Sequence, residues 1–101
     1  MVIMQVLFDY KGGYGEEMYE QCRELAQSIT KESGFIWKIW TENEEKGIAG
    51  GIYAFNSAQQ AETYAKMHAK RLEEFKVATN FRYEILDANE KLSAITNFKL
   101  K

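Results

Sequence analysis

The stretch GFIWKIWTENEEKGIAGGIYAF, residues 34–55, decides the fold. It contains two runs that alternate in the manner of β-strands, Phe35 to Thr41 and Gly50 to Phe55. The polar segment ENEEKG separates them, and a polar connection of this length between two apolar runs is typical of a hairpin. We therefore predict two antiparallel strands here.

The two tryptophans of this stretch lie three residues apart. Side chains of a strand alternate between faces, so Trp37 and Trp40 are predicted on opposite faces of the sheet. A turn around residues 44–47 places Trp40 opposite Gly51 and Trp37 opposite Ala54, and we expect the Trp40 indole to lie over that glycine. One predicted face holds Phe35, Trp37, Ile39, Ile52 and Ala54. The other holds Ile36, Lys38, Trp40, Gly51, Tyr53 and Phe55.

The remaining elements are predicted from the same kinds of pattern. A first strand covers Val2 to Asp9, and a helix begins at Glu16 with Gly34 as a candidate for its C-cap. Ser57 is expected to cap a second helix, Thr79 to Leu86 forms a fourth strand, and the tail can hold a short helical turn. The inward stripe of the first helix is Met18, Cys22, Leu25, Ala26 and Ile29. That of the second is Ala61, Tyr64, Ala65, His68, Leu72 and Phe75.

The predicted order is β-α-β-β-α-β, which is the ferredoxin-like arrangement of the α+β class. It consists of a four-stranded antiparallel sheet with both helices on one face, formed here by a single domain over residues 1–101. RNA-recognition domains share this topology, but their third strand carries a basic and aromatic run. AGGIYAFN contains neither lysine nor arginine, and RNA binding is therefore not expected.

Composition excludes several classes of protein. The chain has 101 residues, 46% of them apolar, and a formal net charge of -2, so it lacks the basic surface that a nucleic acid requires. A single cysteine forms no internal disulfide, and the N-terminus shows no basic leader with an uninterrupted apolar run. We expect a cytoplasmic protein that binds neither nucleic acid nor membrane.

Both faces of the predicted sheet are apolar, and this requires a second cover. The two helices shield one face, while the tail of about a dozen residues is too short to shield the other. The simplest cover is a second copy of the chain, with the two sheets packed face to face. The sequence therefore predicts a homodimer.

The mixed face, with Lys38, Trp40 and Tyr53, has the composition of a small-molecule pocket, and we expect it to lie under the helices. The second helix adds Tyr64 and His68 from its inward stripe, with Arg71 three residues after His68, and we expect these three side chains to face the cavity. His68 is the only histidine, and its neutral imidazole could take a phenolic proton. A hydrogen-bonded core histidine is the more frequent outcome at such a position.

Three further features carry weaker signals. The glycines of Lys11 to Gly15 lack the spacing of a phosphate-binding loop, so a turn is expected there. Cys22 is interpreted as a small buried apolar residue rather than a nucleophile. One histidine and one cysteine, with carboxylates spread mainly along exposed faces, do not predict a metal site.

Several motifs also carry a family resemblance. GFIWKIWTENE, AGGIYAF, FDYKGGYGEEM, LDANEKLSAIT and the helical pattern Tyr64, His68, Arg71, Leu72 resemble the YdhR family of monooxygenases. The resemblance extends over nearly the whole chain. It implies a homodimer of ferredoxin-like subunits, a dimeric α+β barrel, and a relation to antibiotic-biosynthesis monooxygenases that oxidise polycyclic phenols without a bound cofactor.

With this resemblance, the sequence suggests oxygenation of a planar aromatic or quinol-like substrate by dioxygen. Trp40, Tyr53, Phe55 and Tyr64 would hold the substrate, and His68 or a water that it orients would deprotonate it. Lys38 or Arg71 would stabilise negative charge on oxygen. No cofactor is expected, because no flavin-binding or haem-binding motif is visible.

Two alternatives stay open. One is a protein that binds a small aromatic ligand without catalysis. The other is a haem-degrading enzyme of the same superfamily, in which an asparagine, a tryptophan and a histidine lie near the haem. The first strand here offers Gln5 and Asp9 instead of an asparagine, which weighs against the haem alternative.

Overall fold

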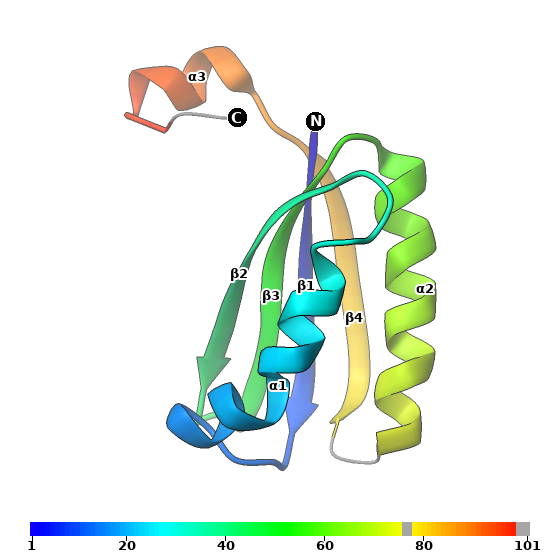
Figure 1. Cartoon of the computed structure of the whole chain (residues 1–101). Coiled ribbons are helices and arrows are strands. Elements are labelled where there is room, and N and C mark those ends of the chain that lie inside the picture. The colour runs from blue at the N-terminus through cyan, green and yellow to red at the C-terminus, as the bar shows by residue number, and fades with distance from the viewer. Residues whose placement is uncertain (76–77, 99–101) are drawn as a thin grey trace.

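The computed structural model describes residues 1–75 and 78–98 and contains four strands and three helices in the described part of the chain (Figure 1). In chain order the elements are β1 (Val2–Tyr10), α1 (Glu16–Ile29), β2 (Phe35–Asn43), β3 (Ile48–Phe55), α2 (Ala58–Phe75), β4 (Ala78–Asp87) and α3 (Glu90–Ile95).

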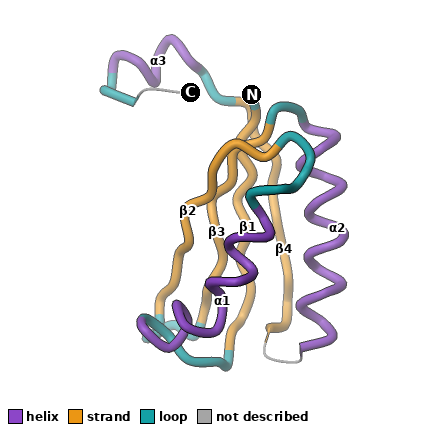
Figure 2. Tube along the Cα trace, viewed as in Figure 1, coloured by secondary structure: helices purple, strands orange, loops and turns teal. Residues whose placement is uncertain are grey.

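The four strands form one sheet in the order β2-β3-β1-β4, and every neighbouring pair is antiparallel (Figure 2). Helices α1 and α2 pack on the same face, since buried residues of both belong to one core with the inward side chains of β1 and β3. The predicted ferredoxin-like α+β fold is therefore confirmed. The two long helices leave the opposite face of the sheet uncovered.

Alternation along β1 explains why the core lies on one face. Val2, Met4, Val6 and Phe8 are buried, whereas Gln5 and Leu7 between them are exposed. The helices complete the core with the apolar stripes predicted for them, because helical residues three or four apart share a face. The helix residues buried in the core are Met18, Ile29, Ala61, Tyr64 and Ala65.

The predicted hairpin register is confirmed, with Trp40 opposite Gly51 and Trp37 opposite Ala54. The placement of Phe35 on the same face as Trp37 is wrong. The register shifts between Phe35 and Trp37, which leaves one extra residue in β2, so Phe35 lies opposite Phe55. The two rings meet edge to face with centroids 6.0 Å apart, and Phe35 packs against the core.

The predicted ends of the helices are confirmed at one position and wrong at another. The Ser57 hydroxyl accepts a hydrogen bond from the Gln60 amide at 3.2 Å, as expected of an N-cap. Helix α1 ends at Ile29 with Thr30 as its C-cap, so Gly34 is not the cap. Gly34 instead has a φ of 78°, a left-handed conformation that favours glycine, immediately before β2. The Phe75 side chain lies outside the described residues.

The outer face of the sheet carries exposed apolar side chains. Ile39 is 53% exposed, and Leu7 and Leu86 are also exposed. Part of the tail reaches this face, where the rings of Trp37 and Phe98 lie 6.2 Å apart. Figure 1 shows α3 apart from the two long helices. Among the described residues, no helix combines the length and apolar character needed to cross a membrane.

The phenylalanines of core and tail should differ in their contribution to stability. Phe55 is fully buried against Phe35, Tyr53 and Tyr64, so Phe55→Ala should lower the free energy of unfolding by about 3–5 kcal/mol. Phe98 is 43% exposed, and Phe98→Ala should lower it by less than about 1 kcal/mol. Urea unfolding followed by circular dichroism measures both values. Equal losses would contradict the assignment of the core.

Candidate functional site

A cavity of about 480 Å³ lies between the two long helices and the sheet. It is located where β1 ends and β3 begins, and α1 and the C-terminal half of α2 form its sides. The mixed face of the hairpin therefore lies under the helices, as predicted. The residues that line the cavity are Phe8, Tyr10, Met18, Gln21, Cys22, Leu25, Lys38, Trp40, Ala49, Gly50, His68, Arg71 and Leu72.

Lys38 supplies one of the basic groups of this cavity. Its Nζ lies 3.4 Å from the centroid of the Trp40 ring and 4.6 Å from that of Tyr53. Aromatic faces attract a cation, but they do not replace a carboxylate. In the described part of the chain the ion pairs are Arg23 with Glu20 and Arg82 with Asp9, so Lys38 has no acidic partner there.

The position of Lys38 depends on Gly51. A Cβ atom at residue 51 would lie 2.6 Å from Cε of Lys38 and 3.2 Å from the Tyr53 ring. The glycine thus provides the space through which the lysine stem crosses β3. We predicted that the Trp40 indole would lie over Gly51, and this prediction is wrong, because the lysine stem occupies that space.

His68 and Arg71 face the cavity from α2. His68 is only 3% exposed, and its ring stacks on Tyr64 with centroids 5.2 Å apart. Its Nδ1 atom is buried without a hydrogen-bond partner, and so are Nε and Nη2 of Arg71. The hydrogen-bonded core histidine that we considered is therefore not observed at Nδ1. Buried polar atoms are usually satisfied, so three orphaned nitrogens on one cavity form an unusual cluster.

Burial changes the basicity of these groups. Loss of solvation, opposed in part by Cys22, lowers the pKa of Lys38 to about 7, and the nearby Arg71 also lowers it. Loss of solvation, with Lys38 and Arg71 nearby, lowers the pKa of His68 to about 3. The imidazole is therefore neutral at physiological pH, and a substantial fraction of the Lys38 amine is neutral as well.

The cavity includes four of the seven predicted site residues, namely Lys38, Trp40, His68 and Arg71. The other three lie in the core behind it: Phe55 is fully buried, and the hydroxyls of Tyr53 and Tyr64 are buried near each other. Our prediction that Tyr53, Phe55 and Tyr64 line the pocket is thus wrong in geometry. The Tyr53 ring lies beneath the Lys38 amine and forms the floor of the space that the amine occupies.

Sequence reasoning missed the contribution of α1. Met18, Cys22 and Leu25 line the cavity together with Tyr10 at the end of β1. The periodicity of α1 predicts its inward stripe but does not distinguish core residues from residues that line a cavity. Because two helices on one face of a sheet leave a gap between them, both inward stripes could have been considered as walls.

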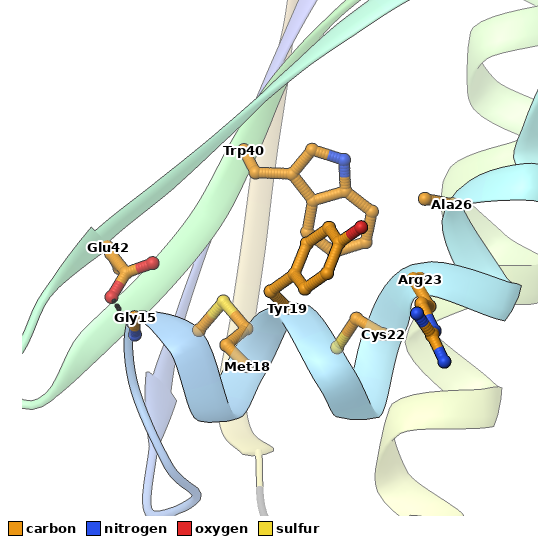
Figure 3. Close-up of a pocket in the computed structure, with 8 residues that line it drawn as sticks. All are labelled: Gly15, Met18, Tyr19, Cys22, Arg23, Ala26, Trp40 and Glu42. Carbon is orange, nitrogen blue, oxygen red and sulfur yellow. Dashed lines mark hydrogen bonds between the residues drawn. The ribbon is translucent and has the colours of Figure 1, made fainter.

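A second hollow of about 330 Å³ adjoins the cavity on the side of α1 (Figure 3). Met18, Cys22 and Trp40 line both spaces, so Trp40 lies between them. At its edge the Gly15 amide donates a 2.7 Å hydrogen bond to Oε1 of Glu42, which joins the start of α1 to β2. This amide is therefore occupied, which agrees with the prediction that the glycine loop is a turn.

Cys22 and the acidic residues offer no metal site. Burial raises the pKa of the Cys22 thiol, with the nearby Lys38 acting in the opposite direction, and the thiol is half-buried on the cavity wall. Over residues 1–75 and 78–98, no group of three or more histidine, cysteine, aspartate or glutamate side chains gathers closely enough to hold a metal ion.

Comparison with known proteins identifies the family. Residues 3–99 match the profile of the family described as "Putative mono-oxygenase ydhR". The chain belongs to the YdhR family. The resemblance found in the sequence motifs is thus confirmed over residues 3–99. The members of this family are described as mono-oxygenases.

Two solved structures show the same fold. One is a heme-degrader, MhuD, from Mycobacterium tuberculosis with two hemes bound in its active site; it has 14% identity and a TM-score of 0.64, over 88% of this chain and 96% of that one. The other is a putative antibiotic biosynthesis monooxygenase from Deinococcus radiodurans, with 15% identity and a TM-score of 0.60, over 88% and 93%. A search of the curated proteins gave no significant match.

The lowered pKa of Lys38 should make stability depend on pH. Between pH 7 and 10 the unfolded chain keeps a proton on this lysine that the folded protein has lost, so stability rises with pH over this window. Between pH 6 and 9.5, the free energy of unfolding should rise by about 1–3 kcal/mol more in the wild type than in Lys38→Met.

The matched control is Lys46→Met, which removes an exposed lysine from the hairpin turn. The free energy of unfolding of this variant should change with pH by the same amount as that of the wild type. Parallel curves for the wild type and Lys38→Met, measured by urea unfolding across the same pH range, would show that Lys38 titrates normally.

Proposed function

We propose that the protein is a cofactor-independent monooxygenase that acts on a planar aromatic or quinol-like molecule in the cavity between helices and sheet. The observation that carries the proposal is a cavity of about 480 Å³ with aromatic walls and basic side chains without acidic partners. Its volume is in the usual range for small-molecule sites, which are apolar with a few orienting groups. The family description supports the reaction type.

The reaction needs a base and an electron-rich substrate. An anthrone-like substrate carries an acidic CH₂ group between two rings. Its proton passes to a protein base, and the resulting carbanion gives electrons to dioxygen and forms a C–O bond. Protonation gives a hydroperoxide, and loss of one water molecule leaves a carbonyl. One oxygen atom enters the product and the other leaves as water. The substrate supplies all four electrons that reduce dioxygen, including the two that a reduced cofactor would otherwise provide.

We assign the base to Lys38 rather than to His68. The CH₂ proton of an anthrone-like substrate is weakly acidic, as is a phenolic proton with a pKa near 10, and each unit of mismatch between the pKa values of acid and base costs about 1.4 kcal/mol. The pKa of Lys38 is about 7 and that of His68 about 3, so the transfer is several kcal/mol more favourable to the lysine. His68 would then act as a neutral group that positions the substrate, and Arg71 would stabilise the anion.

Haem is the cofactor that the structural relatives suggest, and the residues of the cavity do not fit it well. Haem iron takes an axial His, Cys, Met or Tyr ligand. His68 is 3% exposed and stacked on Tyr64, and Met18 is 7% exposed and packed in the core. Burial raises the pKa of Cys22 and of Tyr10, which keeps both protonated. Gln5 and Asp9 of β1 alternate with the inward Phe8 and so lie on the side away from the cavity.

The homodimer is part of the proposal. It is supported by the exposed apolar outer face of the sheet, where Trp37, Ile39 and Leu86 lie away from the helices. Contiguous apolar surface of this kind marks an interaction site. The tail contributes Phe98 to the same face through its contact with Trp37, on the side opposite the cavity. In such a dimer each subunit would keep its own cavity.

Oxygen uptake with anthrone tests the proposed reaction. In metal-free buffer with chelator, the wild type should consume oxygen, and its rate should rise with pH to a plateau above about pH 7, as Lys38 loses its proton. Lys38→Met should reduce the rate by at least about 100-fold and abolish this pH dependence. His68→Gln should have a smaller effect, because its role is positioning.

Lys70→Met on the exposed side of α2 is the matched control and should leave oxygen uptake unchanged. Near-ultraviolet circular dichroism confirms that each variant is folded. A Lys38→Met variant with the full rate would refute Lys38 as the base. No uptake, together with saturable quenching of tryptophan fluorescence by anthrone, would favour the binding protein. A Soret shift with haemin and turnover only in its presence would favour a haem-degrading enzyme.

A substitution on the outer face of the sheet tests the homodimer. Ile39→Glu places a charge among exposed apolar residues and should convert the dimer to a monomer, as measured by sedimentation equilibrium. Met67→Glu adds the same charge to an exposed position on α2 and should leave the mass unchanged. A wild type that sediments as a monomer at all concentrations would contradict the dimer.

A further inference from the structure

The described side chains that line the cavity include basic groups but no acidic group that would balance their positive charge. Lys38 and Arg71 both line it, and the described residues of the lining include no aspartate or glutamate. Arg71 has two buried nitrogens, Nε and Nη2, without partners. Leaving donors of a cationic group unpaired costs free energy in proportion to their burial, so a site of this kind is completed by an acceptor from outside.

Three acidic residues of the chain make contacts outside the cavity. Asp9 and Glu20 pair with exposed arginines, and Glu42 accepts the Gly15 amide at the start of α1. Within the cavity, the Lys38 amine contacts the aromatic faces of Trp40 and Tyr53. These contacts hold the amine in place and leave its donors available to a ligand.

His68 adds a second and independent observation. This side chain is only 3% exposed, and it lines the same cavity one helical turn before Leu72. Its Nδ1 atom has no hydrogen-bond partner. Beside this imidazole nitrogen lie the Lys38 amine, a fraction of which is protonated at physiological pH, and the cationic Arg71. Polar groups from three side chains on two elements, β2 and α2, thus converge on the cavity. Such convergence is typical of a site that recognises an oxygen anion.

We infer that Lys38 and Arg71, with His68 beside them, form an anion site that binds an ionised acidic group of the planar aromatic ligand. The aromatic body of this ligand lies along Phe8, Tyr10 and Trp40. The inference rests on the proposed function, because it assigns a ligand class to the same cavity. The anion is either a fixed carboxylate or a phenolic oxygen that ionises within the site, and the experiment separates these two sources.

Isothermal titration calorimetry with three probes of one ring system tests the inference. The probes are 2-naphthoate, its neutral methyl ester, and 2-naphthol. At pH 7 the wild type should bind 2-naphthoate at least about tenfold more tightly than the ester, which corresponds to one charge-assisted hydrogen bond. If a phenolic oxygen is the natural group, bound 2-naphthol should show the red-shifted absorption of its anion at this pH.

Arg71→Met should reduce the affinity for 2-naphthoate by about tenfold or more and change that for the ester by less than about twofold. Lys70→Met, which removes an exposed charge from the same helix, should change neither. The ratio of the affinities for 2-naphthoate and its methyl ester is measured on the wild type alone. It therefore remains decisive even if Arg71→Met fails to fold.

Each outcome has a separate meaning. Selective binding of 2-naphthoate without ionisation of 2-naphthol supports the anion site with a carboxylate ligand, and ionisation supports it with a phenolic one. Equal affinity for acid and ester overturns the inference, even if anthrone is oxidised and the proposed function stands. Acid-selective binding without oxygen uptake keeps the anion site and removes the monooxygenase.

Discussion

The register in which β2 pairs with β3 determines the character of both faces of the sheet. With Trp40 opposite Gly51, Lys38 and Trp40 lie on the face that the helices cover, and Ile39 lies on the other. A slip of one residue would exchange these sets, because strand side chains alternate with a period of two. The cavity would then lose its amine, and a lysine would replace an apolar residue on the outer face. The cavity and the apolar outer face thus both depend on one pairing.

The same pairing explains which features of the fold could be predicted. Alternation, the apolar helix stripes and the Ser57 cap are local patterns, and the structure confirms each of them. The extra residue that turns Phe35 towards the core could not be predicted, because a bulge depends on which face offers better packing for a large ring. Phe55 provides that packing, and it is distant in sequence.

The site was predictable in its residue types and only partly in its arrangement. The stripe of α2 predicts His68 inward with Arg71 three residues after it, and the alternation of β2 predicts Lys38 on the same side. Their basicity could not be obtained from sequence, because a pKa shift depends on burial and on neighbouring charges in three dimensions. Gly51 illustrates the same limit. The sequence predicts free space above this glycine, but packing decides whether the Lys38 stem or the Trp40 indole fills that space.

The two central properties of the cavity are physically connected. An amine that is buried without a carboxylate has a lowered pKa, and the absence of that carboxylate also leaves its donors free for a ligand. Placing an aspartate beside Lys38 would restore its charge and stabilise the fold, but it would remove both the neutral base and the vacancy for an anion. A cavity with only a structural role would gain from such a pair. Its absence from the described lining therefore favours a ligand that brings the negative charge itself.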